Sequence, residues 1–271
     1  MPELPEVETT VRGLAAVLQD AVLARVEPRR ADLRRAIPPD LRQRLTGARV
    51  IALWRRAKYG VIGTDRGDSL VFHLGMSGRW RLDPGEIGKH DHLVIETEAG
   101  RTIALNDPRR FGSLDLVETE VLDVFAPFAA LGPEPLSDAF DGAHLKRRFA
   151  GRVAAVKLLL LDQRIVAGLG NIYVCEALNI AGIAPTAAAG RLAGARLDAL
   201  ALAIKEVLVS AIAAGGSTLR DYAQPDGDLG YFFKQWRVYG REGLPCPRCT
   251  APVLRRVDGG RSTFYCGKCQ R

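Results

Sequence analysis

The amino-acid sequence predicts an α+β protein built from several parts, and three observations support this prediction. Near the start, apolar residues follow one face of a helix, at Val7, Val11, Leu14 and Leu18. From about residue 22 to 117 the chain consists of short apolar or alternating runs, as expected for antiparallel strands. Beyond residue 140 the pattern becomes helical, and the chain ends in a cysteine-rich module.

The first helix is expected to begin near Pro5. Glu6 and Glu8 lie close to its start, where the positive end of the helix dipole favours acidic residues. Pro2 and Glu3 directly precede the helix, and on pattern alone they are punctuation of its start. The alternative is that these two residues place chemistry at the chain terminus.

Several short runs between residues 48 and 107 are the clearest strand candidates. Each is bounded by glycine, aspartate or proline. Short strands at this spacing indicate an antiparallel sandwich or barrel. The runs cover residues 48–54, 59–65, 69–75, 91–97 and 101–107.

The segment 131–140 is rich in proline and turn-forming residues and marks a domain boundary. The segment 224–233 has the composition of a mobile loop. Between them, helices are expected at 153–162, from near Asn171, and at 192–214, where Gly215-Gly216 is a plausible stop. The sequence therefore predicts three domains, at residues 1–131, 132–224 and 225–271.

The last part of the chain predicts a structural zinc site. Its cysteines form two C-x2-C pairs separated by sixteen residues, a spacing typical of four-thiolate zinc sites. Two disulfides are the alternative, which the expected cytoplasmic location disfavours. The four cysteines are Cys246, Cys249, Cys266 and Cys269.

Between these cysteine pairs, the segments VLRRV and RSTFYC read as two strands of a hairpin. Asp258-Gly259-Gly260 is a hairpin turn signal. Arg261 should therefore lie at the tip of the hairpin, far from the metal. An arginine in such a place is usually only solvated.

The charge balance favours a polyanionic partner, although many basic proteins bind nothing acidic. Lysine and arginine number 38 against 31 acidic residues, a net charge of +7. No apolar run approaches the roughly 20 residues of a membrane helix, and the acidic start does not resemble a secretory signal. We therefore expect a cytoplasmic protein.

Several stretches of the sequence occur together, and in order, in one family. They are MPELPEVET at the start, RRAKY around Lys58, HLGMSG, DPRRFG, GLGNIY and the cysteine hairpin. Together they resemble bacterial formamidopyrimidine-DNA glycosylase, and the resemblance runs from residue 1 to 271. It implies an N-terminal β-sandwich led by a catalytic helix, a helical helix–two-turn–helix domain and a C-terminal zinc hairpin.

The resemblance also implies a function in base-excision DNA repair. Such an enzyme flips oxidised purines, namely 8-oxoguanine and formamidopyrimidines, out of duplex DNA in a basic cleft and excises them. It then cleaves the strand at the abasic site by β,δ-elimination. The expected partner is damaged double-stranded DNA, and the expected state is a monomer with one structural Zn2+ per chain, associated with the nucleoid when bound to DNA.

The resemblance assigns the nucleophile to Pro2 and acid/base assistance to Glu3. Removal of Met1 would expose the secondary amine of Pro2. An α-amino group has a pKa of about 7.7–8.0, so part of it is neutral at physiological pH. The positive end of the following helix should lower this value further, and attack on the sugar C1′ would give a Schiff-base-type intermediate.

Lys58 and Arg261 complete the implied catalytic set. Lys58 follows Arg55 and Arg56 at an apparent strand start, and clustered cations suit a lysine to proton transfer. An exposed basic strand is the alternative. By resemblance Lys58 is a general acid in the first elimination, while Arg261 grips phosphates and assists the second.

Six further residues match DNA contacts of the family. Met76, Arg109 and Phe111 would fill the gap left by the flipped base, with Arg109 donating to the cytosine opposite. The alternatives are core packing for Met76 and Phe111 and a solvated turn for Arg109. By resemblance the residues that contact phosphates are His90, Arg152 and Asn171.

Other interpretations remain open at this point. The sequence KHDH around His90 permits a metal site, although the crowding makes it unfavourable. An endonuclease VIII-type enzyme would use the same chemistry on oxidised pyrimidines. A non-catalytic DNA-binding relative is a different class, against which Pro2, Glu3, Lys58 and Arg261 argue together.

Overall fold

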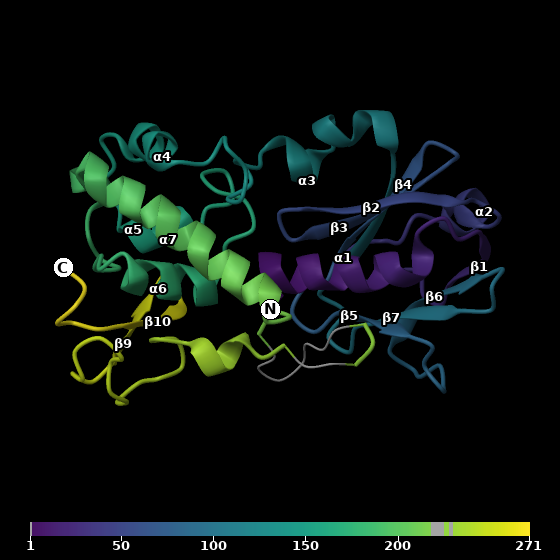
Figure 1. The fold of residues 1–271 in the computed structure, drawn as a ribbon. Helices are drawn as coiled ribbons and strands as arrows, with labels where there is room; N and C mark the ends of the chain where they lie inside the picture. The colour runs from purple at the N-terminus through teal and green to yellow at the C-terminus, as the bar shows by residue number, and fades with distance from the viewer. Residues whose placement is uncertain (1, 218–224, 228–229) are drawn as a thin grey trace. The chain divides into compact units, whose positions relative to one another are not determined.

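The computed structural model describes residues 2–217, 225–227 and 230–271 (Figure 1). Met1 and parts of the predicted loop 224–233 lie outside the described residues. The chain forms two compact units. The first comprises Met1–Ala129 and Ile212–Tyr231, and the second comprises Ala130–Ala211 and Phe232–Arg271.

Helix α1 (Leu4–Leu18) opens the first unit, as the sequence predicts. Glu3 is its N-cap residue, and a capping box fixes the first turn. The Glu3 carboxylate accepts the backbone N–H of Glu6, and the backbone N–H of Glu3 donates to Glu6 Oε2 at 2.8 Å. The predicted apolar stripe is buried, which confirms the helical pattern of Val7, Val11, Leu14 and Leu18.

Two four-stranded antiparallel sheets form most of the first unit, which confirms the predicted sandwich. The first has the order β1-β6-β7-β5, with strands Leu23–Pro28, Asp91–Thr97, Thr102–Asn106 and Arg79–Leu82. The second has the order β2-β3-β4-β8, with strands Val50–Arg56, Tyr59–Thr64, Asp68–His73 and Ser113–Glu118. The shorter elements of this unit are α2 (Leu41–Leu45), η1 (Thr119–Val124) and α3 (Ala126–Ala129).

The core of the first unit lies between α1 and the two sheets (Figure 1). Strands β3 and β4 are buried along almost their whole length, so both read as apolar runs and not as alternation. Gly60 on β3 is required by this packing, because a Cβ atom there would lie 2.1 Å from the ring of Phe72. The Phe72 ring in turn meets Trp80 edge to face, with ring centroids 5.3 Å apart.

The second unit is helical before its C-terminal module. Its elements are α4 (Gly142–Phe149), α5 (Val156–Leu160), α6 (Asn171–Ile180), η2 (Ala189–Arg191) and α7 (Gly194–Ala213), whose last residues enter the first unit. Helices α6 and α7 match the prediction. Helix α5 is shorter than predicted, because its N-cap residue Ala155, with φ −58° and ψ 135°, is not in the helical conformation. Past α7, Gly215 and Gly216 have φ of +75° and +82°, as expected of a helix stop.

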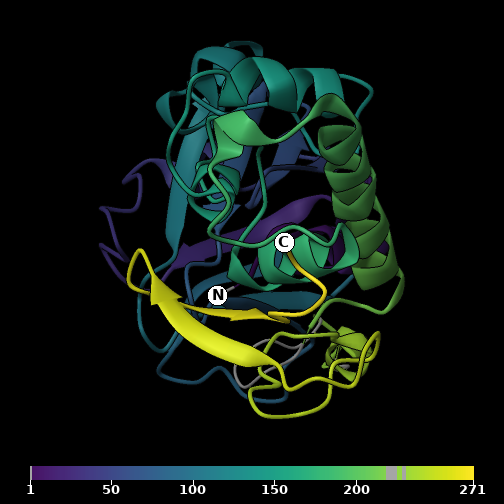
Figure 2. The same cartoon turned by 90° about the vertical axis from the view of Figure 1, so that its left-hand side faces the viewer.

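The C-terminal module follows η3 (Phe232–Gln235) and contains the predicted hairpin, drawn in yellow in Figure 2. Strands β9 (Leu254–Asp258) and β10 (Arg261–Tyr265) pair in antiparallel register. Gly259 and Gly260 join them, with φ of +56° and +73°. A two-residue turn with both φ angles positive matches the right-handed twist of the strands, which explains the Gly-Gly pair.

The described helices include none that could cross a membrane. Helix α7 has 20 residues, which is enough for the thickness of a bilayer core. It carries charges along its length, however, at Arg196, Asp198, Lys205 and Glu206.

Candidate active site

The N-terminal segment lies buried against the start of α1. Pro2 and Glu3 are both buried, and Glu3 is held in the capping box described above. Because the backbone of Glu3 is fixed, the position of the preceding Pro2 relative to the helix is also restricted. Pro2 directly precedes the N-cap residue of α1, at the end of the helix where its dipole is positive.

Glu6 has a structural role in this segment beyond the favourable charge at the helix start that the sequence indicated. Its side chain is buried, and Oε2 accepts the N–H of Glu3 as part of the capping box. Its Oε1 atom accepts the backbone N–H of Ser217 at 2.8 Å. One carboxylate therefore joins the N-terminal segment to the chain that returns to the first unit 211 residues later.

Lys58 occupies the two-residue turn between β2 and β3, not the start of a strand. The residue before it, Ala57, has φ +53°, and Lys58 is only 8% exposed, so the exposed basic strand considered for it is wrong. Arg55 links this turn to α1. Its Nε donates to Glu8 Oε2 at 3.0 Å and its Nη1 to the carbonyl of Ala57 at 2.9 Å.

His73 on β4 lies beside this turn, because it pairs in register with Tyr59. Burial lowers the pKa of His73 to about 4, and the positive charges of Lys58, Arg34 and Arg35 contribute in the same direction. The imidazole is therefore neutral at physiological pH. Its Nδ1 atom accepts the backbone N–H of Gly75 at 3.0 Å.

Met76, Arg109 and Phe111 lie on two loops of the first unit and are exposed. Met76 is 39% and Phe111 43% exposed, so the core packing considered for them is wrong. The guanidinium carbon of Arg109 lies 4.7 Å from the centre of the Phe111 ring, a cation–π contact. Two large apolar side chains and an arginine are thus presented to the outside of the protein.

His90 is half-buried, and its backbone carbonyl accepts the N–H of Asp107 at 2.9 Å. The neighbouring Asp91 carboxylate is already engaged, by Arg81 at 2.8 Å and by Asn106 at 2.8 Å. Across the described part of the chain, the four C-terminal cysteines are the only group of metal-ligating side chains. The structure therefore gives no support to a metal site at KHDH.

The remaining predicted residues lie in the second unit. Arg152 and Arg261 are exposed, and Arg261 is the first residue of β10, at the hairpin tip as predicted. Asn171 is the first residue of α6, and its Nδ2 donates to the carbonyl of Ser262 at 2.8 Å. Its Oδ1 atom is buried without a hydrogen-bond partner among the described residues. The structure thus brings Asn171 next to the residue that follows Arg261.

Lys157 on α5 joins the same contact, and sequence reasoning did not single it out. The side chain is completely buried, and burial lowers its pKa. Its Nζ donates to Thr263 Oγ1 at 2.6 Å and lies 3.4 Å from the carbonyl of Ser262. A single lysine within the apolar run VAAVKLLLL was the signal that could have drawn attention to it.

The cysteine cluster fits a zinc ion. All four cysteines are unpaired by disulfides, so the disulfide alternative is wrong, and their sulfur atoms lie within 4.8 Å of one another. A tetrahedral site with Zn–S bonds of about 2.3 Å places its sulfurs about 3.8 Å apart. The sulfurs of Cys249 and Cys266 are 3.5 Å apart, close to that spacing.

Two buried side chains fasten the zinc module within the second unit. Gln270 accepts from the backbone N–H of Cys266 at 2.8 Å and from Asn179 at 3.0 Å. The Glu176 carboxylate accepts three successive backbone N–H groups, those of residues 237, 238 and 239. Burial raises the pKa of Glu176, and these three donors act against the rise.

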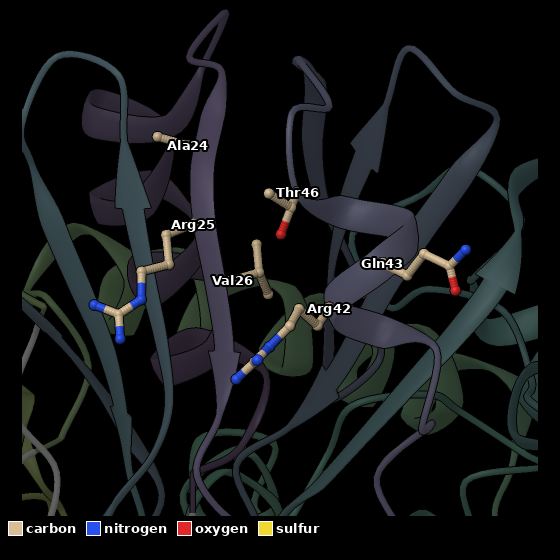
Figure 3. Close-up of a pocket in the computed structure, with 6 residues that line it drawn as sticks. All are labelled: Ala24, Arg25, Val26, Arg42, Gln43 and Thr46. Carbon is tan, nitrogen blue, oxygen red and sulfur yellow. The ribbon is translucent and has the colours of Figure 1, made fainter.

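A surface pocket of about 290 Å³ lies between β1 and α2 (Figure 3). Its arginine on β1, Arg25, is already paired with Glu27 and with Glu96. None of the predicted site residues is among the described residues that line it. They are Ala24, Arg25, Val26, Arg42, Gln43 and Thr46.

Comparison with known proteins identifies the family of the chain. Three family models match the chain: the formamidopyrimidine-DNA glycosylase N-terminal domain over residues 1–114, its H2TH domain over 131–223, and the zinc finger found in FPG and IleRS over 243–271. A formamidopyrimidine-DNA glycosylase of Rhizorhabdus wittichii is 70% identical over the full length of both chains. The chain belongs to the formamidopyrimidine-DNA glycosylase family. It is therefore a DNA glycosylase with a C-terminal zinc finger for one structural zinc.

Solved structures of this glycosylase family share the fold. The Thermus thermophilus MutM (Fpg) protein matches with a TM-score of 0.88 and 41% identity, over 99% of this chain and 98% of that chain. A mutant Lactococcus lactis Fpg in complex with Fapy-dG-containing DNA matches with a TM-score of 0.92 and 33% identity over all of both chains. Another Lactococcus lactis Fpg structure contains DNA with an abasic site.

Proposed function

We propose that the protein is a bifunctional DNA glycosylase and AP lyase that excises oxidised purines from duplex DNA. The observation that carries this proposal is the N-terminal segment, in which Pro2 precedes a buried, capped helix start and Glu3 lies directly beside it. Lactococcus lactis Fpg, a relative of the same fold, has been crystallised with Fapy-dG-containing DNA. The proposed substrates are 8-oxoguanine and formamidopyrimidines.

In the proposed reaction the neutral secondary amine of Pro2, freed by removal of Met1, attacks C1′ of the damaged nucleotide. An N–C1′ bond forms, and the bond from C1′ to the base breaks with its electron pair leaving on the base. Glu3 supplies the proton transfers that base release and opening of the sugar ring require. The amine nitrogen loses its proton, the C1′–O4′ bond breaks with its electron pair and a proton going to O4′, and the product is an iminium ion at C1′.

The iminium ion then makes strand cleavage possible. It acidifies the proton at C2′, whose loss expels the 3′ phosphate, and a second elimination expels the 5′ phosphate. Lys58 is proposed as the general acid of the first elimination, and its burial in a turn tied to α1 through Arg55 and Glu8 supports a fixed position for it. Arg261 is proposed to hold phosphates and to assist the second elimination.

The DNA-binding roles are distributed over both units. Met76, Arg109 and Phe111 are proposed to fill the gap in the duplex, and their exposure supports this role. Phosphate contacts are proposed for His90, Arg152 and Asn171.

A second candidate function is excision of oxidised pyrimidines. It is favoured by a Lactococcus lactis Fpg structure that contains DNA with an oxidised pyrimidine, with a TM-score of 0.91 to this chain. The two candidates are separated by measuring excision from duplexes that carry 8-oxoguanine, a formamidopyrimidine or an oxidised pyrimidine. Faster excision of the pyrimidine lesion would contradict the proposed preference for purines.

Arg109 should set the discrimination between bases opposite the lesion. A good contact to a base edge contributes about 1–3 kcal/mol of discrimination. We expect Arg109→Ala to narrow the preference for a lesion opposite cytosine over one opposite adenine by about tenfold or more. Arg152→Ala is the control, because loss of a phosphate contact should weaken binding to both duplexes by the same factor. If each variant lost excision activity equally on the two duplexes, Arg109 would not be the residue that recognises the opposite base.

A further inference from the structure

The two loops that carry the exposed side chains are joined by a buried hydrogen-bond network. Residues 74–78 follow β4 and carry Met76, and residues 107–112 follow β7 and carry Arg109 and Phe111. Exposed apolar side chains on loops have many rotamers and positions open to them. These side chains can keep one arrangement only if other contacts hold the backbones of the two loops in place.

Asp107 lies at the centre of this network and is only 1% exposed. Its Oδ1 atom accepts the hydroxyl of Ser77 at 2.6 Å, and its Oδ2 atom accepts the backbone N–H of Gly112 at 2.8 Å. The backbone carbonyl of Asp107 is paired with Nε2 of His92 at 2.9 Å. One carboxylate thus joins the Met76 loop to the far end of the Arg109 loop.

Ser77 adds a second connection between the loops. While its hydroxyl donates to Asp107, its oxygen accepts the backbone N–H of Arg109 at 3.2 Å. The chain of bonds runs from the Arg109 backbone through Ser77 to Asp107 and on to Gly112. Removal of the Ser77 hydroxyl alone would therefore leave the Arg109 backbone without this partner.

The loop backbones also touch directly. Gly75 has φ +61°, and a Cβ atom there would lie 2.3 Å from the carbonyl carbon of Phe111. The N–H of Gly75 is held by the neutral imidazole of His73. The two loops thus restrict each other's backbone conformation through contacts at Gly75 and Ser77, the residues on either side of Met76.

We propose that Asp107 and Ser77 are positioning residues for recognition of the base opposite the lesion. They hold Met76, Arg109 and Phe111 in one preformed arrangement before DNA arrives, so that ordering these loops does not oppose binding. The inference rests on the proposed function, since it assigns these three residues to the gap in the duplex. Neither positioning residue touches the reacting atoms.

The test compares Ser77→Ala and Asp107→Asn with a matched control, Ser69→Ala. Ser69 is a fully buried serine of β4 whose hydroxyl bonds to Thr119 at 2.8 Å, at the other end of the strand from the Met76 loop. The readouts are the ratio of kcat/KM for a lesion opposite cytosine to that opposite adenine, and the Tm. We expect Ser77→Ala and Asp107→Asn to lower the ratio about tenfold, the effect of one hydrogen bond.

A double variant shows whether Ser77 acts through Arg109. In a protein that already carries Arg109→Ala, Ser77→Ala should not lower the kcat/KM ratio further, because the side chain that contacts the opposite base is already absent. A wild-type ratio in Ser77→Ala, or an equal loss in Ser69→Ala at the same Tm, would overturn the positioning role. A wild-type protein that excises no damaged base would instead contradict the proposed function itself, which keeps the two failures distinct.

Discussion

Borohydride is expected to link the mature protein covalently to damaged duplex DNA through the nitrogen of Pro2. Reduction of the iminium ion converts a transient intermediate into a stable amine, so the adduct survives denaturation. Mass spectrometry of the linked peptide should show that it begins at Pro2 and lacks Met1. A crosslink that maps to Lys58, or to any other lysine, would overturn the assignment of the nucleophile.

Two variants separate the nucleophile from its assistance. A chain that retains Met1, or an uncleaved N-terminal tag, has an amide at Pro2 with no basic lone pair, so trapping and base excision should fall by several orders of magnitude. Glu3→Gln should slow base release but still trap on a pre-formed abasic site, where no base remains to be expelled. Equal loss of both activities in Glu3→Gln would contradict this division of roles.

Cys249→Ser should lose zinc and DNA binding while the first unit stays folded. Zinc binding and folding of such modules are coupled by about 10–16 kcal/mol, so loss of one thiolate should unfold the module. The core of the first unit is built from residues of that unit alone and should keep its own thermal transition. With four thiolates, the zinc ion has no open position for water and serves structure, not the reaction.

The matched control for the zinc variant is Cys175→Ala, which removes the only cysteine outside the cluster. That protein should retain one zinc ion per chain, measured by atomic absorption, and should bind an abasic-site duplex normally. If Cys249→Ser also retained one zinc ion with unchanged DNA affinity, a structural role for the four-cysteine site would be contradicted.

The parts of the fold that follow from local patterns were predictable from the sequence. The apolar stripe of α1, the strands β2 to β4, β6 and β7, the turn of the zinc hairpin and the cysteine spacing all depend on neighbouring residues. The length of helix α5 was overestimated, because the alanine- and leucine-rich segment begins before the residue at which the backbone enters the helix. The division into three domains at residues 1–131, 132–224 and 225–271 stays a prediction.

Long-range contacts could not be read from the sequence. The pairing of Glu6 with Ser217, and of Lys157 with Thr263, joins residues separated by 211 and 106 positions. Neither pair belongs to a repeating pattern, so only the folded chain brings the partners together. The turn position of Lys58 was missed for a related reason, since RRAKY has no glycine, asparagine or aspartate to signal a turn.

The roles of the N-terminal residues show a different limit. On pattern alone Pro2 and Glu3 are punctuation of a helix start, and the capping box confirms that Glu3 does have this structural role. The proposed catalytic roles came from the resemblance to the glycosylase family, which the comparisons confirm as the family of this chain. A residue with a complete structural explanation can still be a catalytic residue.

The burial of Lys157 also provides a built-in reporter of local opening. An amine-acylating reagent can reach its Nζ atom only while the start of β10 is separated from α5, whereas Lys146 on α4 of the same unit is exposed and should react at once. When opening and closing are fast, the ratio of the two labelling rates gives the fraction of time for which this contact is open. The rate of Lys157 labelling would thus measure how often the contact between α5 and strand β10 of the zinc hairpin opens.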